Sequence, residues 1–185
     1  MKILETPVKG VLIIELDVFG DQRGFFIETY HQKRYQAEGI DSKFVQDNFS
    51  FSKAGALRGL HYQFPNAQAK LMQVIKGEVF DVAVDIRHGS PSFAQWTSVT
   101  LSDSNQRQLF IPEGFAHGFC VLSDSAVLIY KCSDFYSPEN ERGILWSDPD
   151  LDIRWPVQKP LLSEKDCQYR CLKDIPLDQL PVYGK

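Results

Sequence analysis

Several polar side chains that can move protons or stabilise charge occur close together in the middle of the chain. Arg58, His61 and Gln63 lie within one short segment, and Lys70 follows nine residues after His61. A metal site that began with His61 and Gln63 would next need a carboxylate, whereas a lysine repels a metal cation. A histidine beside a fixed positive charge suits a different reaction, in which histidine takes a proton from carbon and the cation stabilises the resulting oxyanion. The sequence therefore predicts an acid–base site without a metal.

The segment around His61 is predicted to be an extended strand with two different faces. One face carries apolar or aromatic side chains that predict sheet packing: Leu60, Tyr62 and Phe64. The other face carries His61 and is predicted to line a small polar cavity, although a purely structural histidine is the alternative. Arg58 has the opposite parity to His61. It is therefore either a surface arginine or reaches the site through a bulge near Gly59.

Three later residues each have a functional and a structural interpretation. His117 either contacts a phosphate or carbonyl group, or is hydrogen-bonded inside a barrel. Tyr130 lies in an apolar strand, where its phenol either gives a proton to carbon from the side opposite His61 or satisfies a single hydrogen bond. Asp166 stands three residues after Ser163 in a capping-box pattern, so it either caps a helix or orients His61.

A second group of polar residues precedes the histidine segment. Solvated surface is the default interpretation for its members, Arg23, Glu28, Gln46, Asp47 and Asn48. Gathered around a pocket, they would bind a diphosphate, a sugar and a nucleobase, because the arginine fork makes paired hydrogen bonds to phosphate. The chain has no Walker loop, no dinucleotide fingerprint and no Gly-x-Ser-x-Gly elbow.

Short strand patterns dominate the chain. About ten strands separated by turns predict a mainly β protein, with an antiparallel sandwich or barrel of jelly-roll type. Lys76-Gly77 predicts a hairpin between two of these strands. Short helices are expected at residues 33–38 and, from the spacing of residues 161–172, near the C-terminus.

Composition and charge limit the classes of protein to consider. With 185 residues, 43% of them hydrophobic, the chain is predicted to be a single domain, residues 1–185. A net charge of −4 argues against a general nucleic-acid binder. We expect no signal peptide and no membrane partner, because the longest early apolar run has four residues. Four cysteines without CxxC spacing predict free thiols and a cytoplasmic protein.

Several long motifs, in order, resemble one known family, that of dTDP-4-dehydrorhamnose 3,5-epimerase. The resemblance runs from about Phe19 to Asp166. The motifs that carry it are residues 23–26 (RGFF), 44–48 (FVQDN), 57–63 (LRGLHYQ), 77–87 (GEVFDVAVDIR) and 111–119 (IPEGFAHGF).

The resemblance implies a fold of the cupin superfamily and sharpens the question of a metal. Typical cupins bind a metal through His-x-His, a following Glu and a later His. The comparable positions here hold His61, Gln63, Lys70 and His117. Two of the four ligands are replaced, one of them by a cation, so the resemblance also implies a site without a metal or another cofactor.

The resemblance further implies a reaction. The substrate would be dTDP-4-dehydro-6-deoxy-D-glucose, whose C4 ketone makes the protons on C3 and C5 acidic. His61 would be the general base, oriented by Asp166, and Lys70 would stabilise the enolate oxygen. Tyr130 would return a proton from the opposite face and so invert the centre.

Binding residues and a homodimer are also implied by the resemblance. Tyr136 would stack on the nucleobase. The other substrate contacts would be Arg23, Glu28, Gln46, Asp47, Asn48, Arg58, His117, Glu141 and Lys165. The family forms homodimers that exchange N-terminal strands, so we expect Arg23 and Glu28 to reach the partner's site or its rim.

The sequence leaves three alternatives open. A related nucleotide-sugar epimerase that inverts only C3 or only C5 would use the same base and acid. A binding module without activity would not need His61, Lys70, Tyr130 and Asp166 together. A metal-dependent cupin such as a dioxygenase would contain stoichiometric metal.

Overall fold

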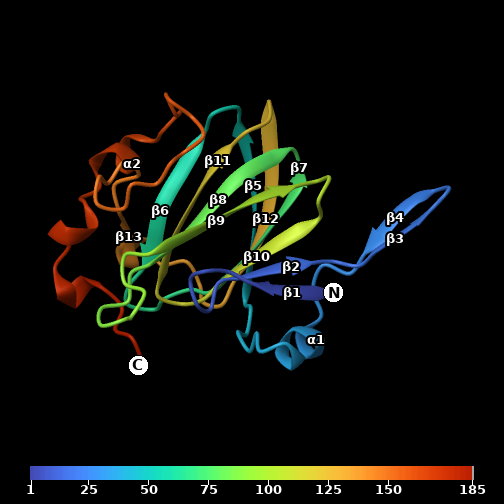
Figure 1. Ribbon diagram of the computed structural model, residues 1–185, viewed down its shortest axis with the longest axis horizontal. Coiled ribbons are helices and arrows are strands. Elements are labelled where there is room, and N and C mark those ends of the chain that lie inside the picture. The colour runs from blue at the N-terminus through green and yellow to red at the C-terminus, as the bar shows by residue number, and fades with distance from the viewer. Residues whose placement is uncertain (185) are drawn as a thin grey trace.

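Two antiparallel sheets face each other, and a small two-stranded sheet projects from them (Figure 1). The computed structural model describes residues 1–184. The six-stranded sheet contains, in spatial order, β1 (Lys2–Glu5), β2 (Leu12–Glu15), β10 (Arg107–Ile111), β7 (Lys70–Lys76), β12 (Ser125–Cys132) and β5 (Gln46–Lys53). The five-stranded sheet contains β13 (Glu141–Gly143), β6 (Leu57–Gln63), β11 (Phe115–Val121), β8 (Glu78–Asp85) and β9 (Trp96–Ser102). The third sheet pairs β3 (Val18–Asp21) with β4 (Gly24–Ile27). This architecture confirms the predicted fold class, a mainly β, cupin-type antiparallel jelly-roll barrel.

The helices are short and lie toward the two ends of the chain, as expected. They are α1 (Gln32–Ala37), α2 (Glu164–Gln168) and three 3₁₀ helices, η1 (Pro138–Asn140), η2 (Leu172–Asp174) and η3 (Leu177–Gln179). The helical spacing of residues 161–172 overstates α2, because the chain becomes extended at Tyr169. Beyond Tyr169, the backbone N–H of Leu145 donates to the Arg170 carbonyl at 2.9 Å. This bond holds the chain beside the end of β13 and prevents the helix from continuing.

The hairpin predicted at Lys76-Gly77 is wrong. β7 and β8 belong to different sheets, so the chain crosses from one sheet to the other at this turn. Gly77 has φ +83°, and a Cβ atom there would lie 2.2 Å from the Ser125 carbonyl oxygen. The glycine is therefore required by a tight crossing rather than by a two-residue hairpin.

Strand alternation divides the apolar residues between three layers. Met72 and Val74 of β7 face inward and pack with Val79 and Ala83 of β8 in the core between the sheets. A second apolar cluster lies on the outer side of the five-stranded sheet, where the C-terminal segment covers it: Leu60, Tyr62, Val82, Val84, Ile144, Leu151 and Leu172 are among its members. The third cluster lies outside the six-stranded sheet, under α1, and includes Ile14, Tyr35, Leu71 and Phe110.

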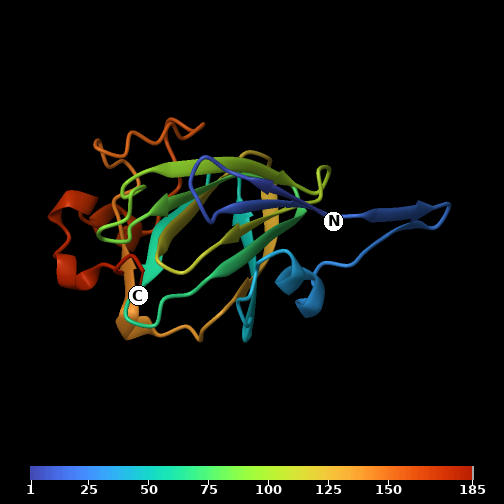
Figure 2. The ribbon, with the colours of Figure 1, turned by 60° about the horizontal axis from the view of Figure 1, so that its bottom comes forward.

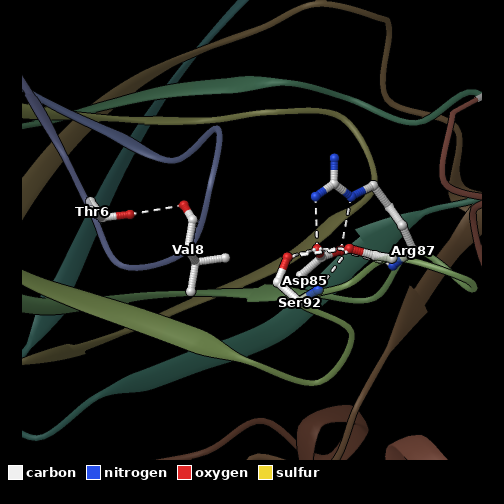
Figure 3. A network of polar contacts seen from close by, with 6 residues as sticks. Thr6, Val8, Asp85, Arg87 and Ser92 are labelled. Atoms are coloured by element: carbon white, nitrogen blue, oxygen red, sulfur yellow. Dashed lines mark hydrogen bonds and ion pairs between the residues drawn. The ribbon is translucent and has the colours of Figure 1, made fainter.

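The end of β8 is fixed by a buried carboxylate. Asp85 is fully buried and accepts hydrogen bonds from the Arg87 guanidinium at 2.7 and 2.8 Å and from the hydroxyls of Ser90 and Ser92 (Figure 3). The Arg87 guanidinium also lies over the ring of Phe115, 4.5 Å from its centroid. Because every partner of Asp85 lies in the same corner of the fold, we interpret this network as structural.

The β3–β4 sheet extends away from the barrel as an arm, which is visible in both ribbon views (Figures 1 and 2). Its aromatic side chains are exposed: Phe19 by 62%, Phe25 by 66% and Phe26 by 67%. Exposed aromatic residues this close together are typical of interaction surfaces. Among residues 1–184, no helix is both long and apolar enough to cross a membrane.

Candidate active site

One cavity of about 310 Å³ opens between the two sheets and collects half of the predicted site residues. Its walls include Gln46, Asn48, His61, Lys70, Tyr130, Tyr136 and Glu141, together with Tyr62, Gln63, Gln68 and Cys132. His61 enters from β6 of the five-stranded sheet, whereas Tyr130 and Lys70 enter from β12 and β7 of the six-stranded sheet. A ligand in this cavity would therefore have the histidine on one side and the phenol on the other.

His61 is paired with Asp166 across the mouth of the barrel. The Nε2 atom of His61 lies 2.6 Å from Oδ1 of Asp166, whose side chain is 3% exposed. Burial would raise the pKa of the Asp166 carboxyl, but the hydrogen bond and charge of His61, with help from Ser163 and Lys165, hold that pKa below its usual value. An ionised carboxylate can only accept, so Nε2 carries the proton and Nδ1 has the free lone pair. This is the tautomer that a general base requires.

The two interpretations of Asp166 are compatible in the folded protein. Its backbone N–H donates to the Ser163 hydroxyl at 3.1 Å, which caps α2 as the sequence predicts. The carboxylate does not return to the cap and is instead used by His61. The capping bond thus fixes the backbone from which the carboxylate reaches the histidine.

Lys70 places an ammonium group in the cavity without a direct counter-ion. Among residues 1–184, no carboxylate lies within 4.0 Å of its Nζ atom. Burial lowers the pKa of Lys70, and the acidic groups of Cys132, Asp81 and Glu141 oppose this shift. An unpaired, partly desolvated cation of this kind is well suited to receive a developing oxyanion.

A bulge in β6 brings Arg58 toward the same side as His61. His117 opposes His61, but Phe119 opposes Arg58, so the register between β6 and β11 shifts by one residue. This confirms the bulge predicted near Gly59, where φ is +121°. The Arg58 guanidinium donates to the Ser52 hydroxyl at 2.9 Å and to the Phe51 carbonyl at 3.3 Å.

The charge of Arg58 also acts on Tyr130. Burial raises the pKa of the Tyr130 phenol and nearby Cys132 adds to the increase, whereas Arg58 opposes it. The phenol therefore keeps its proton at neutral pH and is available as an acid.

Three predicted binding residues form a chain at the mouth of the cavity. The Tyr136 hydroxyl donates to Oε2 of Glu141 at 2.7 Å, and the Lys165 ammonium pairs with Oε1 of Glu141 at 2.7 Å. Burial would raise the pKa of Glu141, but the bonds from Lys165 and Tyr136 lower it overall. Tyr136 is 51% exposed, so its ring has a free face at the cavity entrance.

His117 lies deeper in the barrel than His61. Its Nε2 atom is 2.8 Å from Oδ1 of Asp81, and both side chains are buried. The second oxygen of Asp81 is buried without a hydrogen-bond partner among the described residues. Asp81 is a fully buried polar residue whose pairing with His117 the sequence did not identify.

Six predicted binding residues are not in the wall of this cavity: Arg58, His117 and Lys165, described above, and Arg23, Glu28 and Asp47. Arg23 pairs with Asp21 at 2.6 Å at the tip of the arm, and Glu28 pairs with Arg34 at 2.7 Å beside α1. Asp47 points to the other face of β5, where its carboxylate is 72% exposed and pairs with Lys131. None of these three side chains contributes to the wall of the cavity within its own chain.

Sequence reasoning missed Gln68 and Cys132 of the cavity wall, and it placed Gln63 on the face of His61 without giving it a role in shaping the cavity. Gln63 donates to the carbonyls of Asn66 and Phe135 and accepts from the backbone N–H of Ser137, so it fixes the loop after β12. Gln68 donates to the Asp134 carbonyl in the same loop at 2.8 Å. These bonds join segments about 70 residues apart, and no local pattern signals them. Cys132 could have been found, because its strand alternation matches that of Tyr130.

Within residues 1–184, no three His, Cys, Asp or Glu side chains gather as a metal-binding cluster. The absence of a metal requirement stays a prediction. The residues of the cavity instead suit acid–base chemistry: a histidine held by a carboxylate, a protonated phenol on the opposite wall and an unpaired ammonium between them. Fold and cavity together define a cupin-type barrel equipped to move protons on a small polar ligand.

The chain belongs to the dTDP-4-dehydrorhamnose 3,5-epimerase family, whose family model matches residues 5–174. It is 60% identical over 168 residues to a dTDP-4-dehydrorhamnose 3,5-epimerase of Shigella flexneri. The matched region covers 90% of this chain and 93% of that protein. Its structure matches that of the 3,5-epimerase RmlC from Legionella pneumophila in complex with dTDP-4-keto-L-rhamnose, with a TM-score of 0.97 and 52% sequence identity. The match covers 100% of this chain and 99% of the Legionella chain. It also matches ChmJ, a 3′-monoepimerase from Streptomyces bikiniensis in complex with dTDP-quinovose, with a TM-score of 0.90 and 36% sequence identity. This match covers 96% of this chain and 92% of ChmJ.

Proposed function

We propose that this protein converts dTDP-4-dehydro-6-deoxy-D-glucose to dTDP-4-dehydro-L-rhamnose by epimerisation at C3 and C5, as a step in dTDP-L-rhamnose biosynthesis. The observation that carries the proposal is the entry of His61 and Tyr130 into one cavity from opposite sheets. Family membership and the ligand of the Legionella structure support the same substrate.

The reaction begins with removal of a proton next to the C4 ketone. Nδ1 of His61 takes this proton, while Asp166 holds the ring and stabilises the imidazolium that forms. Electrons move onto the ketone oxygen, where the Lys70 ammonium stabilises the enolate; a contact of this type contributes roughly 3–4 kcal/mol if it resembles an oxyanion-hole donor. Tyr130 then donates its proton from the opposite face, which inverts the carbon.

The remaining predicted residues bind the substrate in this proposal. Gln46, Asn48, Glu141 and Lys165 lie at or beside the cavity wall, and the free face of Tyr136 stacks on the nucleobase. Arg58 and His117 contact the diphosphate from the barrel side, since guanidinium and imidazole N–H groups both donate to phosphate oxygens. The reaction needs no metal or other cofactor.

Solvent-deuterium exchange tests the base and the acid separately. In deuterated buffer, His61→Asn is expected to abolish exchange at both C3 and C5, whereas Tyr130→Phe keeps some exchange but yields little inverted product. NMR of the 4-keto sugar nucleotide follows both positions. Near wild-type exchange in a folded His61→Asn protein would remove His61 from the role of base. Undiminished epimerisation in Tyr130→Phe would remove the tyrosine from the role of acid.

A second candidate function is epimerisation at C3 alone. The matching 3′-monoepimerase structure supports it, because the same base and acid serve a single inversion. The deuterium experiment separates the two functions: label at both C3 and C5 of the product supports the 3,5-epimerase, and label at C3 alone supports the monoepimerase.

We further propose a homodimer in which the β3–β4 arm crosses to the partner. The exposed aromatics of the arm are matched by Phe49 and Phe51 on β5, which are 71% and 55% exposed. Arg23 and Glu28 lie outside the cavity of their own chain, so a crossing arm gives them a binding role at the partner's site or its rim. Asp47, on the outer face of β5, would join them there.

Subunit complementation tests the exchanged arm. Arg23→Ala lacks the arm contact and His61→Asn lacks the base, so each homodimer is expected to be impaired. Mixed after unfolding and refolding, half of the dimers pair the two variants, and each of these contains one complete site, so activity recovers to about a quarter of wild type. Recovery no greater than the sum of the two separate activities would contradict the exchange, and a monomer in analytical ultracentrifugation would contradict the dimer.

The whole chain, residues 1–185, is proposed to form one domain that works in the cytoplasm. Its four cysteines are free thiols in the structure, which is the state that a reducing compartment maintains. A nucleotide-sugar substrate is in keeping with that compartment. Neither nucleic acid nor membrane is a partner in this proposal.

A further inference from the structure

The aromatic ring of Tyr169 lies against the catalytic histidine and is not part of the cavity wall. The ring centroids of Tyr169 and His61 are 5.9 Å apart, with the planes at 71°, which is an edge-to-face contact. Tyr169 directly follows α2, the helix that carries Asp166. The His61 ring is therefore held by Asp166 at its Nε2 atom and by Tyr169 at a second point.

The strand next to His61 leaves room for this ring. Gly143 of β13 is the cross-strand partner of His61. A Cβ atom on Gly143 would lie 2.2 Å from Cε2 and 2.4 Å from Cζ of Tyr169. The φ angle of Gly143 lies outside the left-handed region, so its backbone conformation does not itself require glycine. The close approach of Tyr169 is what excludes a side chain at this position.

The ring, rather than the hydroxyl, makes the contact. Among residues 1–184, the Tyr169 hydroxyl forms no hydrogen bond, although the residue is only partly exposed. Burial raises the pKa of Tyr169, and the carboxylates of Glu141 and Asp166 raise it further. The side chain is thus a neutral aromatic wall beside the His61–Asp166 pair.

We infer that Tyr169 is a positioning residue. Its ring restricts rotation of the His61 imidazole and shields the His61–Asp166 hydrogen bond from water. Gly143, which has no side chain, leaves the space that the Tyr169 ring occupies. This inference rests on the proposed role of His61 as the base. The ring keeps Nδ1 directed at the substrate carbon. Without it, the imidazole samples orientations in which proton transfer fails.

The first test compares two variants of Tyr169. Tyr169→Ala is expected to lower kcat by about 3- to 10-fold with little change in KM, because one aromatic contact in the transition state is lost while the binding residues stay in place. Tyr169→Phe keeps the ring and is expected to stay within about twofold of wild type. Tyr183→Ala, which removes an exposed tyrosine whose ring lies beside Arg87 and outside the cavity wall, is the matched control.

A double-mutant cycle with Gly143 tests the contact itself. Gly143→Ala should lower kcat in the wild-type background, because the new methyl group displaces the Tyr169 ring. In the Tyr169→Ala background the methyl has room, so adding Gly143→Ala should cause no further loss. Equal losses from Gly143→Ala in both backgrounds would overturn the inference, as would a Tyr169→Ala protein with wild-type kcat.

A spectroscopic signal separates positioning from general loss of structure. The proton between His61 Nε2 and Asp166 should give a resolved downfield NMR signal in wild type and Tyr169→Phe. Faster exchange with water should broaden it in Tyr169→Ala, and an unchanged signal there would contradict the shielding role. His61→Asn distinguishes the two proposals: if it retains exchange, the base assignment fails, whereas if it abolishes exchange and Tyr169→Ala is unaffected, only the role of Tyr169 fails.

Discussion

The His61–Asp166 pair allows a graded prediction of rate. The perturbation is replacement of Asp166 by Asn, which keeps an oxygen acceptor for Nε2 but removes the charge, and by Ala, which removes both. The bond is 2.6 Å long and the carboxylate is 3% exposed, so little water is available to replace it. His61→Asn serves as the reference for complete loss of the base.

The magnitude follows from the kind of hydrogen bond that each variant retains. A hydrogen bond to a charged group contributes about 1.5–3 kcal/mol, and a neutral one about 0.5–1.5 kcal/mol. If the difference appears in the transition state, Asp166→Ala lowers kcat by about 10- to 150-fold and Asp166→Asn by about 10-fold, at 1.36 kcal/mol for each factor of ten. The loss for Asp166→Asn is smaller than the 10²–10⁴-fold expected when the base itself is removed, and the loss for Asp166→Ala reaches only the lower end of that range.

The assay is the initial rate of deuterium incorporation at C3 and C5, measured by NMR at saturating substrate. Thermal unfolding followed by circular dichroism checks that the variants stay folded, which is expected because the cap of α2 uses the backbone N–H of residue 166 rather than the carboxylate. In a His61→Asn background, Asp166→Ala should cause no further loss, since the two residues act as a unit. Equal rates for wild type and a folded Asp166→Ala protein would refute the argument, and so would Asn and Ala variants that are equally slow.

Two further predictions concern pH and the bulge. Because burial lowers the pKa of Lys70 below the ordinary 10.5, its ammonium is present below that lowered pKa and is lost as pH rises through it. We therefore expect kcat to fall as pH rises, at a pH lower than that at which Tyr130, whose pKa is raised, loses its proton. Lys70→Arg stays charged and should move this fall in kcat to higher pH. If the fall stays at the same pH in Lys70→Arg, a group other than Lys70 causes it. Gly59→Ala should destabilise the protein by at least about 2 kcal/mol in urea unfolding, because φ is +121° and the new Cβ would lie 2.5 Å from the Gly118 Cα. Gly89→Ala, at φ +82° with open space around it, isolates the conformational strain and should cost less; equal costs would contradict the role of the close approach.

The sequence by itself determined most of the strands and the chemistry of the site. Alternation in Phe80–Ile86 separates Val82 and Val84 from Ala83, and the structure places the two valines in the outer cluster and Ala83 in the core between the sheets. The occurrence of His61 and Lys70 without a nearby carboxylate indicated acid–base chemistry, and both line one cavity. These features depend on residue type and local spacing, which a single sequence contains.

Long-range pairing was decided only by the tertiary structure. The turn at Lys76-Gly77 has a local hairpin pattern, but β7 and β8 pair with different strands, because sheet membership depends on partners elsewhere in the chain. Strand β13 has three residues and becomes visible only by its pairing with β6. A one-residue register shift between β6 and β11 determines the direction of the Arg58 side chain. The presence of Gly59 in the sequence did not by itself fix that direction.

The same distinction applies to the site. The sequence left two interpretations open for His61 and for Asp166. The structure brings these residues, 105 positions apart, into contact, and Asp166 both takes part in the cap of α2 through its backbone N–H and orients His61 through its carboxylate. The pairing of His117 with Asp81 and the ring of Tyr169 against His61 had no signal in the sequence. Local patterns specify which groups a strand or helix presents, but which groups meet depends on how two sheets and a C-terminal segment pack together.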